Sequence, residues 1–149
     1  MELNEIMKGV ELFDGLEDDE IDKVISLCQE RQYKESEIVA KQNSHGDELF
    51  IIQEGFVEVV VAGRAGGAGK VIVNLGTGQT VGEMSLVDQG PRSATVRAIN
   101  TPTIVQVIKE KDFEALCREN TRIGYIVMRN IAADLSFRLR QRHLSDIVG

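Results

Sequence analysis

The segment of residues 81–98, with the sequence VGEMSLVDQGPRSATVRA, contains the residues best suited to chemistry. Arg92 carries a planar fork of donors that suits a phosphate, and it comes just before a predicted strand. Glu83 can accept hydrogen bonds from a hydroxyl group, but its charge repels a phosphate. A short helical turn predicted at Glu83–Leu86 would expose backbone amides, and Gly82 would let a ligand approach the backbone closely. Together these groups fit a sugar phosphate, although a turn held by a surface ion pair would show the same spacing.

The middle of the chain, from about Glu30 to Lys109, must position this segment. It consists of short β-branched runs punctuated by glycine, a pattern that predicts a β-sandwich, jelly roll or barrel with hairpins between sequential strands. The segment GRAGGAG at residues 63–69 is predicted to be the tip of one hairpin. The expected strands are Ile38–Lys41, Glu48–Gln53, Phe56–Ala62, Lys70–Leu75, Ser93–Ile99 and Thr103–Lys109.

Helical periodicity is found at both ends of the chain. Between Leu16 and Gln29 the apolar residues recur at i, i+3, i+4 and i+7, and four carboxylates in the first turn suit the helix dipole. After Lys111 the pattern predicts a short helix and then a longer one that reaches to about Leu144. The apolar stripe of the longer helix is Ile123, Ile126, Val127, Ile131, Leu135 and Leu139.

Composition and charge exclude several classes of function. The net charge of −7 disfavours nucleic-acid binding, and apolar runs fall short of the roughly 20 residues that a membrane helix needs. The acidic amino terminus does not resemble a signal peptide, so we expect a cytoplasmic protein. His45 and His143 lie too far apart in sequence for a usual zinc site, and the two cysteines indicate no disulfide framework. No Ser-His-Asp or Cys-His set is evident, so we do not expect an enzyme.

The segment 81–95 resembles the phosphate-binding cassette of the cyclic nucleotide-binding domain family. This family is found in bacterial catabolite activator proteins, protein kinase A regulatory subunits and cyclic-nucleotide-gated channels. The resemblance depends on the Gly-Glu pair, the nine-residue spacing and the run Pro-Arg-Ser-Ala-Thr-Val. It extends upstream through ESEIVAKQNSHGDELFIIQEGFVEV, with Gly46 and Gly55 at turn positions, and through LGTGQTVGE.

The resemblance implies a mainly β fold with flanking helices, namely an antiparallel jelly-roll (β-roll) sandwich with N-terminal helices and a C-terminal helix pair. The expected organisation is a single domain over 1–149. Its parts would be N-terminal helices at 1–29, a β-roll at 30–109 that includes the cassette at 81–95, and C-terminal lid helices at 111–146.

The resemblance also implies roles for individual residues. Glu83 would take the ribose 2′-hydroxyl, and Arg92 would pair with the cyclic phosphate, which the Ser93 hydroxyl and amide could also reach. Gly82, Ser85 and Ala94 correspond to positions that give backbone amides or close approach, whereas Val73 corresponds to an apolar residue on the purine. The full expected binding set is Gly82, Glu83, Met84, Ser85, Arg92, Ser93, Ala94, Val73 and Val81.

The last helix is expected to supply a lid residue over the base. By helical register the candidates are Asp134, Leu135, Arg138 and Leu139. Ser93 favours cAMP over cGMP, although its hydroxyl could also meet the guanine amino group. Asp134 could accept from guanine, or it could be a solvated helix position. The ligand expected is therefore cAMP rather than cGMP, with no cofactor and no metal.

The implied mechanism is a regulatory one, in which bound nucleotide draws the last helix over the base and the helix position is the output. The alternative is the sensing portion of a transcription regulator that lacks its DNA-binding domain. The expected partner is another protein or a second copy that docks on the last helix through Ile131, Leu135 and Leu139. Packing of this stripe against the chain's own β-roll explains these residues equally well.

Overall fold

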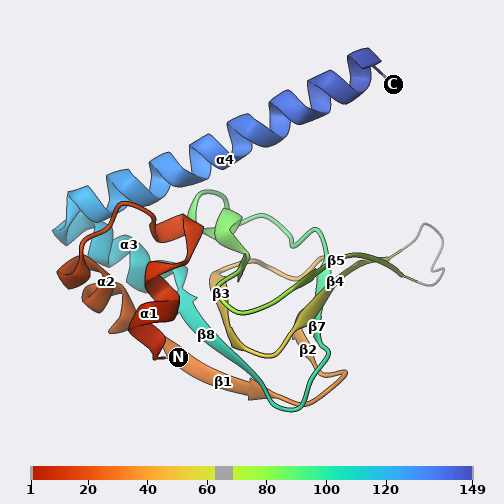
Figure 1. Ribbon diagram of the computed structural model, residues 1–149, viewed down its shortest axis with the longest axis horizontal. Coiled ribbons are helices and arrows are strands. Elements are labelled where there is room, and N and C mark those ends of the chain that lie inside the picture. The colour runs from red at the N-terminus through yellow and green to blue at the C-terminus, as the bar shows by residue number, and fades with distance from the viewer. Residues whose placement is uncertain (1, 63–68, 149) are drawn as a thin grey trace.

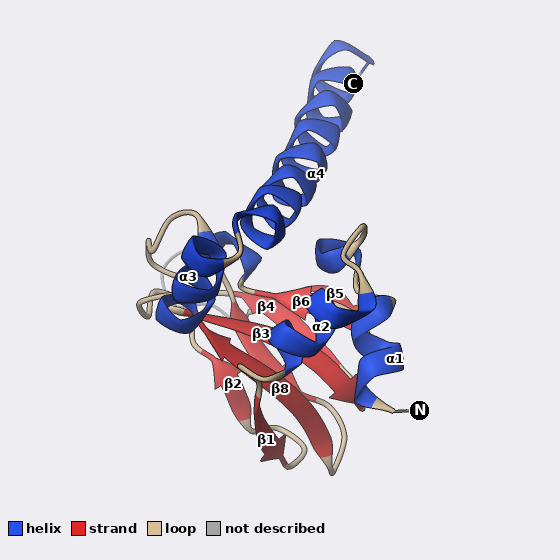
Figure 2. Cartoon of the chain, turned by 90° about the vertical axis from the view of Figure 1, so that its left-hand side faces the viewer, coloured by secondary structure: helices blue, strands red, loops and turns tan. Residues whose placement is uncertain are grey.

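The computed structural model describes residues 2–62 and 69–148, with side chains up to Arg142 in the last helix. Within these residues, eight strands form two antiparallel four-stranded sheets in the orders β1-β8-β3-β6 and β2-β7-β4-β5 (Figure 2). The expected mainly β jelly roll with helices at both ends is therefore confirmed. The strands are β1 (Gln29–Tyr33), β2 (Ile38–Ala40), β3 (Glu48–Glu54), β4 (Val57–Val61), β5 (Lys70–Leu75), β6 (Thr80–Val81), β7 (Thr95–Ala98) and β8 (Thr103–Lys109).

Helices flank the sandwich at both ends of the chain. The last helix, α4, runs over the N-terminal helices and continues past the β-roll (Figure 1). Within the part of the chain described, no helix combines the length and apolar character needed to cross a bilayer. The helical elements are α1 (Leu3–Lys8), η1 (Glu11–Phe13), α2 (Asp18–Ile25), η3 (Glu83–Leu86), α3 (Glu110–Glu119) and α4 (Thr121–Val148).

Two separate clusters of buried residues form the core. One lies between the two sheets and includes Phe50, Ile52, Val96 and Val105. The other joins the helices to the first sheet, because strands β3 and β8 alternate and so present residues to both clusters. Its members include Met7, Phe13, Ile21, Leu49, Phe113, Ile123, Val127 and Ile131.

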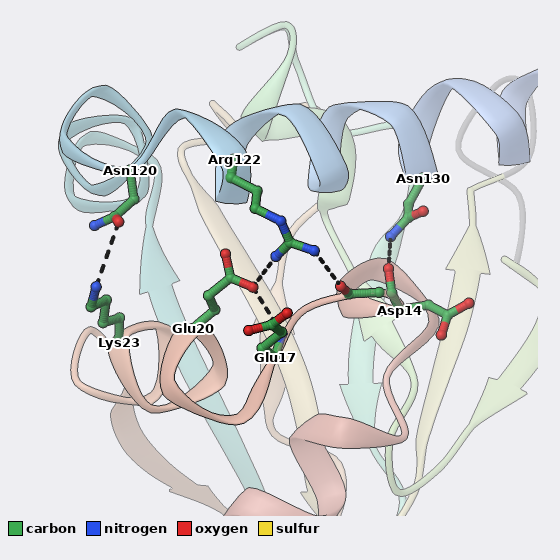
Figure 3. Close-up of polar contacts among 8 residues, drawn as sticks. Asp14, Glu17, Glu20, Lys23, Asn120, Arg122 and Asn130 are labelled. Atoms are coloured by element: carbon green, nitrogen blue, oxygen red, sulfur yellow. Dashed lines mark hydrogen bonds and ion pairs between the residues drawn. The ribbon is translucent and has the colours of Figure 1, made fainter.

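Polar contacts attach the first three turns of α4 to the N-terminal segment (Figure 3). Arg122 forms an ion pair with Glu20 and donates to the carbonyl of Gly15 at 3.3 Å. The Asn130 amide donates to the carbonyls of Leu12 and Asp14, each at 2.9 Å. The base of α4 is therefore held by buried apolar residues and by polar contacts together.

Several expectations need correction. The helix predicted over Leu16–Gln29 extends only over α2, because the chain enters β1 directly afterwards. Strand β1 was not predicted, since its sequence QERQY is polar and occupies an exposed sheet edge without apolar alternation. Most of the predicted hairpin tip, residues 63–68, lies outside the described residues. The stripe of α4 is buried at Ile131 but exposed at Leu139, which is 58% accessible.

Candidate ligand-binding site

A cavity of about 760 Å³ opens between the second sheet, the segment 80–96 and α4. Its volume falls within the range of small-molecule sites. All nine residues of the expected binding set line it: Val73, Val81, Gly82, Glu83, Met84, Ser85, Arg92, Ser93 and Ala94. The structure thus brings together residues from β5, β6, η3 and the loop before β7.

Gly82 fixes the sharp change of direction between β6 and η3. Its φ of 82° lies in the left-handed region that favours glycine. A Cβ atom there would lie 2.8 Å from the carbonyl of Glu48 and 2.9 Å from Nη1 of Arg92. Ser85 closes the same turn, because its amide and its hydroxyl both donate to the Gly82 carbonyl, at 3.0 and 2.6 Å. Both donors of Ser85 are therefore engaged in this turn, which they hold beside the cavity.

The Arg92 guanidinium lies on the wall of the cavity and is half-buried. Nη2 donates to the carbonyl of Glu48 at 3.3 Å, and the guanidinium carbon lies 5.0 Å from the centre of the Phe50 ring. Burial lowers the pKa of Arg92 from its ordinary value, against the opposing effect of the carboxylates of Glu48 and Asp47. Among the described residues no carboxylate forms an ion pair with Arg92, so its remaining N–H groups are available for an anion.

The loop of residues 43–46 holds the Arg92 backbone in place. Asn43 donates to the carbonyl of Arg92, and the Arg92 amide donates to Ser44, each at 2.8 Å. Gly46 donates to the carbonyl of Gly90 at 3.3 Å. A Cβ atom at Gly46 would lie 3.4 Å from that carbonyl, so a residue without a side chain suits this close approach.

Glu83 faces α4 across the cavity. Its carboxylate lies 3.7 Å from the guanidinium of Arg138, which also pairs with Asp134 at 2.8 Å one turn earlier on the helix. The Glu83 side chain is mostly buried, whereas that of Arg138 is 61% exposed. Only one side chain of α4, that of Arg138, therefore lines the main cavity in the described part of the chain.

The four lid candidates separate into different environments. Arg138 lines both the main cavity and a smaller cavity of about 380 Å³, whereas Asp134 lines the smaller cavity and not the main one. Leu135 packs against the helical core cluster, and Leu139 is exposed. The helical register alone could not separate them, because the wall that α4 faces depends on how the helix leaves α3.

The apolar part of the wall contains residues that the sequence reasoning missed. Val59 pairs directly with Val73 across the β4–β5 hairpin, and Ala40, Leu75 and Val96 complete this surface. The hairpin pairing could have identified Val59 if the register had been known. That register contains a bulge between Val59 and Val60, which no local sequence signal indicates.

The side chains around the cavity decide which kind of ligand it suits. Within residues 2–62 and 69–148, no group of three or more His, Cys, Asp or Glu side chains is placed to hold a metal ion. The cavity is lined by a cationic fork, a carboxylate and an apolar surface formed mainly by the second sheet. These are the groups needed to bind an anionic ligand that also carries a hydroxyl and a flat apolar part.

Comparison with known proteins agrees with this arrangement. The family model described as cyclic nucleotide-binding domain matches residues 30–120. The cyclic AMP receptor protein of Thermus thermophilus is 35% identical over 138 residues, which cover 93% of this chain and 61% of that protein. The crystal structure of Thermus thermophilus catabolite activator protein superposes with a TM-score of 0.80 at 32% identity, covering 93% and 62% of the two chains. A cyclic nucleotide-binding domain from Methylobacillus flagellatus gives a TM-score of 0.79 at 27% identity, covering 93% and 77%.

The fold and the site together define the class of the protein. The chain belongs to the cyclic nucleotide-binding domain family. It spans less than two thirds of the length of the Thermus thermophilus receptor protein that it resembles.

Proposed function

We propose that this domain binds a cyclic purine nucleotide in the main cavity, with cAMP favoured over cGMP, and acts as a regulatory module. The observation that carries the proposal is the position of Arg92. Its guanidinium is held on the wall of a cavity that Glu83 also lines, and it has no carboxylate ion-pair partner among the described residues. An unpaired, partly desolvated guanidinium is a strong site for a phosphate.

The cavity is lined by both a cationic and an anionic side chain, and this combination supports a sugar phosphate as the ligand. Arg92 and the exposed Ser93 would hold the cyclic phosphate, and Glu83 would accept a hydrogen bond from the ribose 2′-hydroxyl. Glu83 cannot take the phosphate, because two negative charges repel each other in a partly desolvated site. The orientation of the ligand therefore follows from the charges of the two residues.

The base would lie on the apolar surface formed by Val59, Val73 and Val81. The preference for cAMP is supported by the position of Asp134, the residue best suited to guanine. Its carboxylate lines the smaller cavity and pairs with Arg138, so a guanine would have to compete for it. Adenine needs no such acceptor.

The regulatory part of the proposal concerns α4. Arg138 connects the outer half of this helix with Glu83, the proposed ribose ligand. A nucleotide that engages Glu83 would change this contact, and the helix would shift between two positions. The shift cannot exceed the difference in affinity of the nucleotide for those two positions.

A second candidate function is the sensing portion of a transcription regulator. It is supported by the similarity to the cyclic AMP receptor protein, of which this chain spans 61%. Both functions share the nucleotide site and differ in what the position of α4 controls. An enzyme is disfavoured, because the polar residues of the cavity suit binding and form no nucleophile–base pair.

The partner proposed for α4 is a second copy of the chain. The stripe expected from the sequence includes Ile131, which is buried in the chain's own core. The surface available to a partner is therefore a neighbouring face of the helix. The exposed and half-exposed apolar positions follow the 3-4 spacing of a coiled-coil seam. They are Tyr125, Met128, Ala132, Leu135 and Leu139, of which Met128 and Leu135 also pack partly against the chain's own helical core. Sedimentation of the wild type as a dimer, and of Leu139→Glu as a monomer, would support this partner; a monomeric wild type would exclude it.

The nucleotide site is tested by calorimetric titration with cAMP and with cGMP. We expect the wild type to bind cAMP more tightly than cGMP, and Arg92→Ala to weaken cAMP by about 100-fold, as loss of a charged hydrogen-bonding partner does. Arg97→Ala is the matched control, because Arg97 pairs with Glu58 outside the cavity and should leave the affinity unchanged.

Three results would contradict the proposal. If neither nucleotide binds to the wild type, the proposed function is wrong. If Arg92→Ala binds cAMP with unchanged affinity, the proposed site is wrong. Consumption of the nucleotide during incubation would show that the domain is an enzyme.

A further inference from the structure

Phe50 lies beneath Arg92, the residue proposed to bind the phosphate. It belongs to β3, is 1% exposed and forms part of the core between the two sheets. Its strand neighbour is Val81, the residue just before the Gly82 turn. The guanidinium carbon of Arg92 lies 5.0 Å from the ring centre, within the distance at which a cation and an aromatic ring attract each other.

The ring is one of three contacts that determine where the guanidinium lies. The carbonyl of Glu48 accepts from Nη2, and Gly82 leaves space for Nη1, since a Cβ atom there would lie 2.9 Å away. The strand that carries Phe50 and Glu48 is fixed in turn, because Arg31 donates to both carboxylate oxygens of Glu48 at 3.3 and 2.7 Å. The carbonyl fixes one edge of the guanidinium, and the ring supports one face.

We propose that Phe50 is a positioning residue for Arg92, so that its aromatic ring, and not only its bulk, contributes to the binding of the phosphate. This inference rests on the proposed function, because it assumes that Arg92 binds an anionic ligand. Arg92 lies on the cavity wall and forms no ion pair with a carboxylate among the described residues, so the face of the Phe50 ring supplies an attraction that an ion pair would otherwise give. An aliphatic residue at position 50 would fill the core but would leave the guanidinium face unsupported.

The test is a double-mutant cycle between Phe50 and Arg92, measured as the calorimetric affinity for cAMP. We expect Phe50→Leu to weaken cAMP by about tenfold, the effect of a cation–π contact in a desolvated site. In the Arg92→Ala background the same substitution should change the affinity by less than about twofold, because the group that it positions is absent. Phe50→Tyr retains a ring and should stay close to the wild type.

The matched control is Phe113→Leu. Phe113 is also 1% exposed, but it belongs to the helical core cluster. Phe113→Leu should lose about as much stability against urea unfolding as Phe50→Leu does, and should keep its affinity for cAMP. If Phe50→Leu does not fold, Phe50→Met, whose unbranched side chain adapts better to the shape of the site, replaces it in the cycle.

The outcomes separate this inference from the function on which it rests. Equal effects of Phe50→Leu in both backgrounds, or an equal loss of affinity in Phe113→Leu, would reduce Phe50 to a core residue. If Arg92→Ala weakens the binding of cAMP but neither Phe50→Leu nor Phe50→Met does, the positioning role of Phe50 is wrong and the proposed nucleotide site is still supported. If the wild type does not bind a cyclic nucleotide, both proposals are wrong.

Discussion

The two walls of the main cavity are built in different ways. The cassette, residues 81–95, is held by backbone hydrogen bonds to the loop of residues 43–46 and by a left-handed turn at Gly82. The helical wall consists of one described side chain, that of Arg138, which is 61% exposed. Under the proposed function, the cassette would therefore determine the geometry of the ligand, and the helical wall would contribute less to it.

A similar difference divides α4 itself. Its first half is attached by the buried residues Ile123, Val127 and Ile131 and by the polar contacts of Figure 3. Its outer half leaves the body, and Phe137 and Leu139 are exposed there (Figure 1). If the helix responds to a ligand, the base should act as the fixed point and the outer half should move.

The largest effect is expected from a change in the fixed wall. Gly82→Ala should weaken cAMP by about 100-fold, because its Cβ atom would displace the carbonyl of Glu48 and the guanidinium of Arg92, and a ligand group moved by about 1 Å can lose that much. It should also destabilise the fold by at least about 1 kcal/mol, the cost of a left-handed non-glycine residue. Calorimetry and urea unfolding measure the two effects.

Gly78→Ala is the control for Gly82→Ala. Gly78 has a φ of 85°, but a Cβ atom there would meet nothing within 4 Å. Gly78→Ala should therefore lose stability through the left-handed backbone conformation alone, and its affinity for cAMP should stay within about twofold of the wild type. Equal losses of affinity in both variants would mean that the turn conformation, rather than the space beside Arg92, determines binding.

The cassette wall was also the part that the sequence predicted best. Glu83 and Arg92 belong to one short segment, so their relation depends on local turns that leave recognisable residues such as Gly82 and Pro91. The structure places the whole expected set around one cavity. Most strands were predicted for the same reason, since alternation and glycine turns are local signals.

The features that were missed depend on distant contacts. Strand β1 is polar and forms only because β8 pairs with it along a sheet edge. The contribution of Val59 depends on a bulge in the β4–β5 register. Arg138 lines both cavities, whereas Asp134, one turn earlier on α4, lines the smaller cavity, and this difference depends on how the helix packs against the N-terminal segment.

A smaller effect is expected from a change in the helical wall. Arg138→Ala should weaken cAMP by only about two- to fivefold, because an exposed ion pair at 3.7 Å contributes little. Arg142→Ala, one turn further along the same helix, should have no effect and serves as the control. If Arg138→Ala loses as much affinity for cAMP as Arg92→Ala, both walls hold the ligand equally, and the proposed difference between them is wrong.

The smallest effect concerns the base of α4. Hydrogen bonds from Arg122 and from the Glu17 amide lower the pKa of Glu20 below its ordinary value of 4.5. A carboxylate with a lowered pKa stabilises the fold above its ordinary pKa, and this contribution disappears as the pH falls through the lowered value. Glu20→Gln should therefore have a slightly lower Tm than the wild type at pH 7, and the difference should shrink below about pH 4.5. Asp22→Asn, an exposed carboxylate on the same helix, is the control. A Tm difference for Glu20→Gln that persists at low pH would mean that the side chain contributes by packing, and that its charge does not hold α4 in place.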